Sequence, residues 1–170
     1  RSRRRTPPRR GRQGRDGRGI RQGDVYALNA PYDGGTHLPD ITVVMPVFAA
    51  EGEAEPAWFV AARGHHADIG GIAPGSMPAG SRTVDEEGIL IDNFLLVEQG
   101  RLREVELRAL LGSGPWPARN PDRNLDDLRA QVAACAKGAA ELRRIAAEQG
   151  REVVEAYMGH VQDAAEEAVR

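Results

Sequence analysis

Residues 40–65 read DITVVMPVFAAEGEAEPAWFVAARGH, two apolar runs joined by a polar segment. The runs, Ile41 to Phe48 and Ala57 to Arg63, are rich in β-branched and aromatic residues, and the segment between them contains Gly and Pro. This pattern predicts two strands and a loop. If the strands pair as an antiparallel hairpin centred near residues 52 and 53, Asp40 lies opposite His65 and His37 lies opposite Asp68. The residues on both sides of the hairpin would then meet at one end.

Histidines and aspartates flank this predicted hairpin on both sides. The segment before it reads GGTHLPD (34–40) and the segment after it reads GHHADIGG (64–71), and together they hold three of the four histidines. Nitrogen and carboxylate ligands without sulfur suit Mn²⁺, Fe²⁺ or Zn²⁺. We therefore expect a single divalent metal site, although histidines at a strand end can also simply cap backbone groups. The candidate ligands are His37, Asp40, His65, His66 and Asp68.

A long loop rich in Gly and Pro, IAPGSMPAGSRTVDEEG (72–88), follows the second cluster. Loops of this length often have a function. The backbone amides of Gly70, Gly71 and Gly75 with the Ser76 hydroxyl could hold an anion such as a carboxylate or a phosphate. Gly70, Gly71 and Ser76 are therefore candidate substrate-binding residues, although a general turn would have the same composition.

The second half of the chain has helical periodicity. A short helix is expected over residues 103–111, and Asn124 is expected to cap a long helix that Gly150 interrupts. A further helix, which carries His160, then runs to Arg170. The apolar stripe of the long helix is Leu125, Leu128, Val132, Cys135, Ala139, Leu142 and Ile145. We predict an α+β fold, with a strand-rich N-terminal half that carries the site and a helical C-terminal half.

The first 21 residues differ from the rest of the chain. They contain ten arginines and one aspartate, whereas the remainder carries 13 basic and 24 acidic residues. We expect residues 1–21 to be disordered and residues 22–170 to form one partial domain. The arginine-rich segment is interpreted either as a nucleic-acid-binding arm or as a mis-set start or out-of-frame translation of GC-rich DNA. The second interpretation is favoured, because such translation produces this Arg, Gly and Pro bias and because the segment has no interleaved aromatic residues for base stacking.

Composition also limits the class of protein. The single cysteine, Cys135, excludes an internal disulfide. No apolar run reaches the ~18 residues of a membrane span, and no secretory leader is recognisable. We therefore expect a soluble, cytoplasmic protein.

Five blocks of the sequence resemble, in order, the hydantoinase B/5-oxoprolinase family, most closely its 5-oxoprolinase type. The resemblance covers residues 22–170, and family members are far longer, so the chain resembles a fragment. The blocks are GDVYALNAPYDGGTHLPDITVVMPVF (23–48), RGHHADIGGIAPGSMP (63–78), EEGILIDNFLLV (86–97), ARNPDRNLDDLRAQVAA (118–134) and AYMGHVQDAAEEAVR (156–170).

The resemblance implies ATP-dependent opening of a cyclic amide, either 5-oxoproline to glutamate in glutathione metabolism or a hydantoin. In this mechanism a hydantoinase A-like, ATP-binding subunit or domain phosphorylates the lactam oxygen, and the B-like part hydrolyses the activated ring with water activated by a metal. The sequence has no G-x-x-x-x-G-K-[ST] motif, which agrees with ATP being bound by the partner.

By motif, the resemblance makes His37, Asp40 and His65 the best ligand candidates, with His66 and Asp68 as further ligands or as residues that orient the first three. One departure affects this assignment. The family usually has Asn-Asp-Pro where this chain has Asn29-Ala30-Pro31, so a carboxylate near the site is missing. The alternative is therefore an inactive remnant or an assembly module that docks on a hydantoinase A-like partner through its helices.

Overall fold

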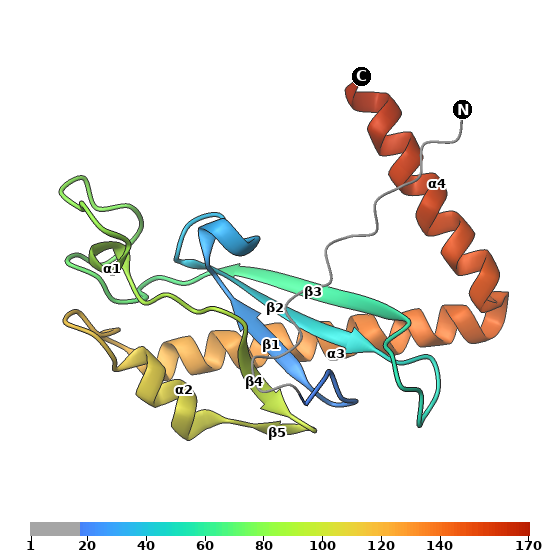
Figure 1. Ribbon diagram of the computed structural model, residues 1–170, viewed down its shortest axis with the longest axis horizontal. Helices are drawn as coiled ribbons and strands as arrows, with labels where there is room; N and C mark the ends of the chain where they lie inside the picture. The colour runs from blue at the N-terminus through green and yellow to red at the C-terminus, as the bar shows by residue number, and fades with distance from the viewer. Residues whose placement is uncertain (1–17) are drawn as a thin grey trace.

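A computed structural model describes residues 18–170. Its N-terminal half forms a five-stranded antiparallel sheet in the order β3-β2-β1-β4-β5, and helices dominate the C-terminal half (Figure 1), so the predicted α+β class is confirmed. The strands are β1 (Val25–Leu28), β2 (Asp40–Val47), β3 (Trp58–His65), β4 (Phe94–Glu98) and β5 (Arg101–Leu102). The helices are the 3-10 turn η1 (Pro31–Asp33), α1 (Val84–Glu87), α2 (Glu104–Leu111), α3 (Pro121–Gln149) and α4 (Arg151–Val169).

Residues 1–17, on which most of the expected disordered segment falls, lie outside the described residues. Residues 18–21 are described. The Arg18 guanidinium donates to the carboxylate of Asp24 at 2.8 Å, and Asp24 is fully buried. This ion pair joins the start of the described chain to the beginning of β1.

The predicted hairpin forms with the predicted register. β2 and β3 pair antiparallel from Asp40 opposite His65 to Val47 opposite Trp58. Alternate residues of β2, such as Ile41 and Val43, are buried, while Thr42 and Val44 between them are only partly buried. A shift of one residue would move these apolar side chains to the other face, so the register is strongly specified.

Helix α3 lies along one face of the sheet and closes the main core (Figure 1). Its side chains at spacings of three and four pack against the inward side chains of β1, β2 and β4. The fully buried members from the two layers include Ala27, Ile41, Val43, Leu96, Leu125 and Leu128. The sheet and α3 therefore act as one packed unit.

The start of α3 differs from the prediction. The helix begins at Pro121, and its cap is Asn120, whose side chain accepts a hydrogen bond from Arg123 N at 3.2 Å. Proline suits the first helical position because its missing N–H has no intrahelical partner there. Asn124, the predicted cap, lies one turn inside the helix and is 3% exposed. This position lets Asn124 contact the segment after β3 instead of closing the helix end.

Gly150 ends α3 as predicted, and α4 leaves at an angle to it (Figure 1). Only Val154 of α4 is buried, and it packs with Val47, Trp58 and Ala139 in a small second core. Other apolar residues of α4 and the end of α3 line an open groove of about 770 Å³. No helix within residues 18–170 is long and apolar enough to cross a membrane.

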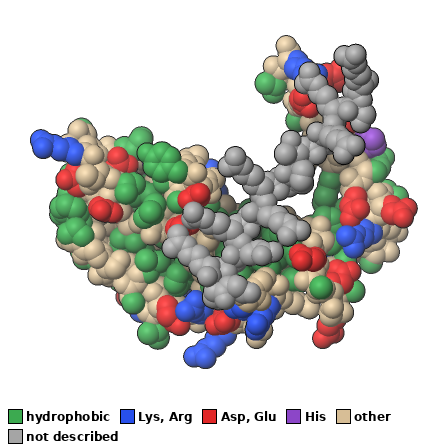
Figure 2. All heavy atoms as spheres, viewed as in Figure 1, with side chains coloured by type: hydrophobic (Ala, Val, Ile, Leu, Met, Phe, Trp, Pro, Cys, Tyr) green, Lys and Arg blue, Asp and Glu red, His purple; other side chains and the backbone are tan. Residues whose placement is uncertain are grey.

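The face drawn in Figure 2 has acidic and basic side chains interspersed, while hydrophobic side chains gather around α1 and its neighbouring loops. Ile72, Met77 and Leu90 from this region are exposed. The long loop that follows the second histidine cluster therefore carries exposed apolar side chains.

Asn29 holds three separate segments together beside the sheet. Its side-chain amide donates to Leu38 O at 2.8 Å and Ile89 O at 2.9 Å, and its Oδ1 accepts from Ile91 N at 2.6 Å. Residues 89 and 91 bond to Asn29, and the regular strand β4 begins only at Phe94.

We predict that Asn29→Ala lowers the free energy of unfolding by about 3 kcal/mol, because Asn29 is fully buried and its three backbone partners would stay buried without bonds. The control is Asn120→Ala, which removes an exposed helix cap and should cost about 1 kcal/mol. Urea unfolding measures both. Equal losses of unfolding free energy in the two variants would contradict the role of Asn29 in holding these segments together.

Candidate metal centre

Three predicted ligands meet at the end of the hairpin. His37 Nδ1 lies 2.9 Å from Asp40 Oδ2, and His65 Nδ1 lies 3.0 Å from Asp40 Oδ1. The two imidazole rings have centroids 5.2 Å apart. Each of the three residues offers a ligand atom, and these atoms all lie within 4.8 Å of one another. A group of this composition and spacing could hold one metal ion.

The backbone explains how His37 reaches this cluster. The β2–β3 ladder ends at Asp40 and His65, and His66 N then donates to Pro39 O at 2.8 Å. Residues 37–40 form a turn in which Asp40 N donates to His37 O at 3.0 Å. The prediction that His37 lies opposite Asp68 is therefore wrong, because the strands stop pairing before that point. The turn folds His37 back over the Asp40–His65 pair.

The electrostatics of Asp40 favour an anionic carboxylate. Desolvation acts to raise its pKa, but hydrogen bonds from Thr36 and His65 and the electrostatic influence of His37 and His65 outweigh this effect and lower the pKa. Thr36 Oγ1 donates to Asp40 Oδ2 at 2.9 Å. The side chain of His65 is 54% exposed, while those of His37 and Asp40 are 22% exposed. The two histidines and the carboxylate are thus partly open to solvent.

His66 points away from this cluster into the protein. It is 1% exposed and contacts two amide side chains of α3. Its Nε2 lies 3.1 Å from Gln131 Oε1, and its Nδ1 lies 3.1 Å from Asn124 Nδ2. Because an amide oxygen accepts and an amide nitrogen donates, His66 carries its proton on Nε2 and accepts at Nδ1. Both ring nitrogens therefore have protein partners.

Asp68 also lies apart from the three clustered ligands. Its carboxylate accepts from Arg119 Nη1 and the Arg119 backbone N, each at 2.7 Å, and from Gly70 N at 3.3 Å. Arg119 Nη2 further donates to Gly71 O at 2.8 Å. The predicted ligand Asp68 thus fastens the glycine loop to the segment before α3.

The candidate substrate-binding residues are not gathered into one site. Gly71 N donates to Trp116 O at 3.0 Å, and a Cβ added to Gly70 would lie 2.4 Å from that same oxygen. Both glycines have positive φ and allow close packing of backbone segments. Their amides already have partners, while Ser76 is exposed further along the loop.

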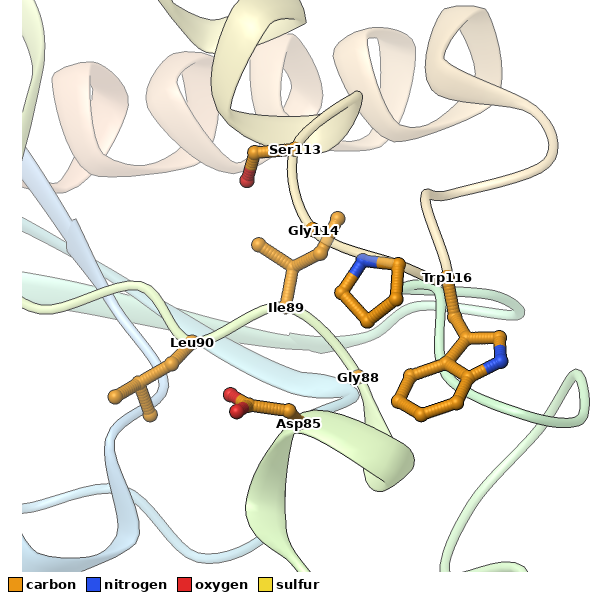
Figure 3. A pocket seen from close by; sticks show the side chains of 8 residues that line it. Asp85, Gly88, Ile89, Leu90, Ser113, Gly114 and Trp116 are labelled. Atoms are coloured by element: carbon orange, nitrogen blue, oxygen red, sulfur yellow. The ribbon is translucent and has the colours of Figure 1, made fainter.

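A cavity of about 260 Å³ lies between residues 85–90 and the segment after α2. In Figure 3, Asp85 extends from α1, and Ser113 and Trp116 come from the opposite segment. The full lining is Asp85, Gly88, Ile89, Leu90, Ser113, Gly114, Pro115 and Trp116. The lining of this cavity combines polar and apolar residues.

Sequence reasoning missed the two buried polar residues of α3 that bond to His66, the residue next to His65. Asn124 and Gln131 lie two helical turns apart on the face of α3 that also buries Leu125 and Leu128. Polar residues within an apolar stripe were the available signal, since buried amides need specific partners. Those partners could not be named from spacing alone.

The fold and the cluster define an α+β domain that presents two histidines and a carboxylate at the end of a β-hairpin. The model of the hydantoinase B/oxoprolinase family matches residues 10–170. The chain belongs to the hydantoinase B/oxoprolinase family.

Individual relatives agree with this assignment. A 5-oxoprolinase from Dictyostelium discoideum is 44% identical over 150 residues, which are 88% of this chain and 11% of that protein. The caprolactamase subunit beta of Pseudomonas jessenii is 30% identical over 151 residues, 89% of this chain and 25% of that subunit. The crystal structure of the ATP-dependent caprolactamase from Pseudomonas jessenii has a TM-score of 0.69 at 31% identity, covering 88% of this chain and 24% of that one. The chain therefore spans between about a tenth and a quarter of these relatives.

We predict that acidification destabilises the domain through His66. Burial lowers the pKa of His66, although the hydrogen bond with Gln131 acts in the opposite direction. An unfolded histidine has a pKa of about 6.5. Below that pH the unfolded chain binds a proton that the folded chain does not, so the free energy of unfolding falls by up to about 1.4 kcal/mol per pH unit, until the folded pKa is reached.

Urea unfolding in chelator, between about pH 7.5 and 5.5, measures this effect. His66→Asn removes the titrating ring and should flatten the pH dependence, although the variant is less stable. His160→Asn, at an exposed position on α4, should retain the slope of the parent. Equal slopes for all three proteins would refute the assignment.

Proposed function

We propose that His37, Asp40 and His65 hold one divalent cation, and that this centre belongs to the hydrolytic part of an ATP-dependent cyclic amide hydrolase. The observation that carries the proposal is the convergence of these three side chains within 4.8 Å in a chain of the hydantoinase B/oxoprolinase family. Two imidazoles and one carboxylate suit Mn²⁺, Fe²⁺ or Zn²⁺. His66 and Asp68, whose polar atoms have other partners, support the site from the protein interior.

The side chains have distinct parts in this proposal. A divalent ion at this site would supply Lewis acidity and a nucleophile at neutral pH. Asp40 supplies the negative charge that attracts the cation and aligns both imidazoles through their Nδ1 atoms. Thr36 holds one carboxylate oxygen, which limits rotation of Asp40. The exposed edge of His65 leaves room for a substrate to approach.

The proposed reaction is the opening of a ring amide after activation by ATP. It is supported by the family and by relatives named 5-oxoprolinase and ATP-dependent caprolactamase. We assign ATP binding to a hydantoinase A-like subunit or domain, since one relative is itself named as a subunit. The substrate is a small cyclic amide, 5-oxoproline or a hydantoin, and the reaction takes place in the cytoplasm. Residues 22–170 form part of the hydrolytic domain.

A second candidate function is a non-catalytic assembly module. Ala30 favours it, because the resemblance places a carboxylate at this position. Ala30 is 4% exposed, and its carbonyl accepts from Gly35 N at 2.8 Å in the loop that leads to His37. An aspartate here would be desolvated and would need a cation or hydrogen-bond donors. The natural chain lacks that carboxylate beside the proposed site.

We predict that the purified chain binds about one divalent ion and that His37→Ala/His65→Ala abolishes binding, because two of three ligands are removed. Elemental analysis after dialysis against limiting Mn²⁺, Fe²⁺ or Zn²⁺ gives the metal content. The matched control is His160→Ala, which removes the histidine outside both clusters. Retention of metal by the double variant would exclude these ligands.

We predict ATP-dependent ring opening when the chain is combined with a hydantoinase A-like partner, and loss of turnover on Asp40→Asn, which removes the anionic ligand. Release of the amino acid product from 5-oxoproline or a hydantoin gives the rate. Ala30→Asp distinguishes the two candidate functions. Turnover that appears only in Ala30→Asp indicates that the chain is an inactive remnant, whereas metal binding without turnover in either protein favours the assembly module.

A further inference from the structure

The side chain of Gln131 reaches from α3 into the end of the β2–β3 hairpin. Its Nε2 donates to Ile41 O at 2.9 Å and to Ala62 O at 3.0 Å, while its Oε1 accepts from His66. Two carbonyl oxygens around one nitrogen fix the orientation of the amide. Gln131 is 9% exposed, so water offers little replacement for these bonds.

These contacts lie beside the candidate ligands on both strands. Ile41 follows Asp40 in β2, and His66 follows His65 after β3. On the other side of His65, Gly64 leaves space for the Gln131 amide, since an added Cβ would lie 3.1 to 3.3 Å from its atoms. One side chain of α3 thus touches the neighbours of Asp40 and of His65.

The hairpin needs such a contact at this point. Asp40 opposite His65 is the last pair of the β2–β3 ladder, and beyond it the two segments are joined by the hydrogen bond from His66 N to Pro39 O. Strand ends open more readily than strand centres. A fixed contact behind the last pair therefore limits how far the two ligands can separate.

Asn124, two helical turns before Gln131 on α3, bonds to the same segment after β3. Its Nδ2 donates to His66 Nδ1 and also to Asp68 O at 2.9 Å. The reversed amide would place its oxygen against two acceptors, so the orientation follows from its partners. Through two buried amides, helix α3 therefore bonds to the carbonyl oxygens of Ile41, Ala62 and Asp68 and to the ring of His66.

We propose that Gln131 is the positioning residue of the metal centre: it ties β2 and β3 to α3 beside their last pair and so sets the spacing of Asp40 and His65. The inference rests on the proposed metal site. It adds that metal affinity depends on a buried side chain of a distant helix that contributes no ligand. Positioning partners behind metal ligands typically change affinity by about 10- to 100-fold.

Co²⁺ titration followed by visible absorption tests the proposal, because both the affinity and the spectrum report on the ligand geometry. Gln131→Leu keeps the approximate volume and removes all three hydrogen bonds; we expect a Kd for Co²⁺ raised by at least about tenfold and an altered spectrum. Leu128→Ala is the control. It creates a cavity on the same face of α3 and should lower stability while leaving the Kd within about twofold.

Gly64→Ala provides a second variant if Gln131→Leu fails to fold. Its Cβ pushes on the Gln131 amide from the sheet side and should also weaken Co²⁺ binding. An unchanged Kd for Co²⁺ in Gln131→Leu overturns the positioning role and leaves the metal site intact. If Gln131→Leu does not fold, an unchanged Kd in Gly64→Ala has the same meaning. The same increase in Leu128→Ala also overturns it, because the effect would then follow stability. Failure of the parent chain to bind Co²⁺ overturns the metal site and, with it, the inference.

Discussion

The pairing of Asp40 with His65 at the end of the β2–β3 ladder is the constraint on which the rest of the site depends. An antiparallel register fixes which residues face each other, and a shift by one residue would expose Ile41 and Val43. Packing of the hairpin on α3 therefore also fixes the carboxylate beside the imidazole. The core and the candidate site are specified by the same register.

Helix α3 connects the two parts of this arrangement. Its apolar residues close the core, while Asn124 and Gln131 on the same face bond to the segment that carries His65. Buried amides are favourable only when their partners are in place. The helix is thus both the cover of the sheet and the support of the candidate metal centre, although it contributes no ligand.

Much of the hairpin was predictable from the sequence, because two apolar runs of similar length determine both the strands and the register. The position of His37 was not predictable in this way, since it depends on where the ladder stops and the turn at residues 37–40 begins. His66 and Asp68 resembled ligands by composition. Their actual partners, Gln131, Asn124 and Arg119, lie more than 50 residues away in sequence and are brought close only by tertiary packing.

The proposed metal centre places one divalent ion between His37, Asp40 and His65. Anomalous diffraction from crystals of the Mn²⁺-loaded chain tests this placement, because the signal locates the ion itself. One anomalous peak is expected at about 2.0 to 2.2 Å from a nitrogen of each histidine and an oxygen of Asp40. A peak elsewhere, or loaded crystals with no peak among these three side chains, would contradict it.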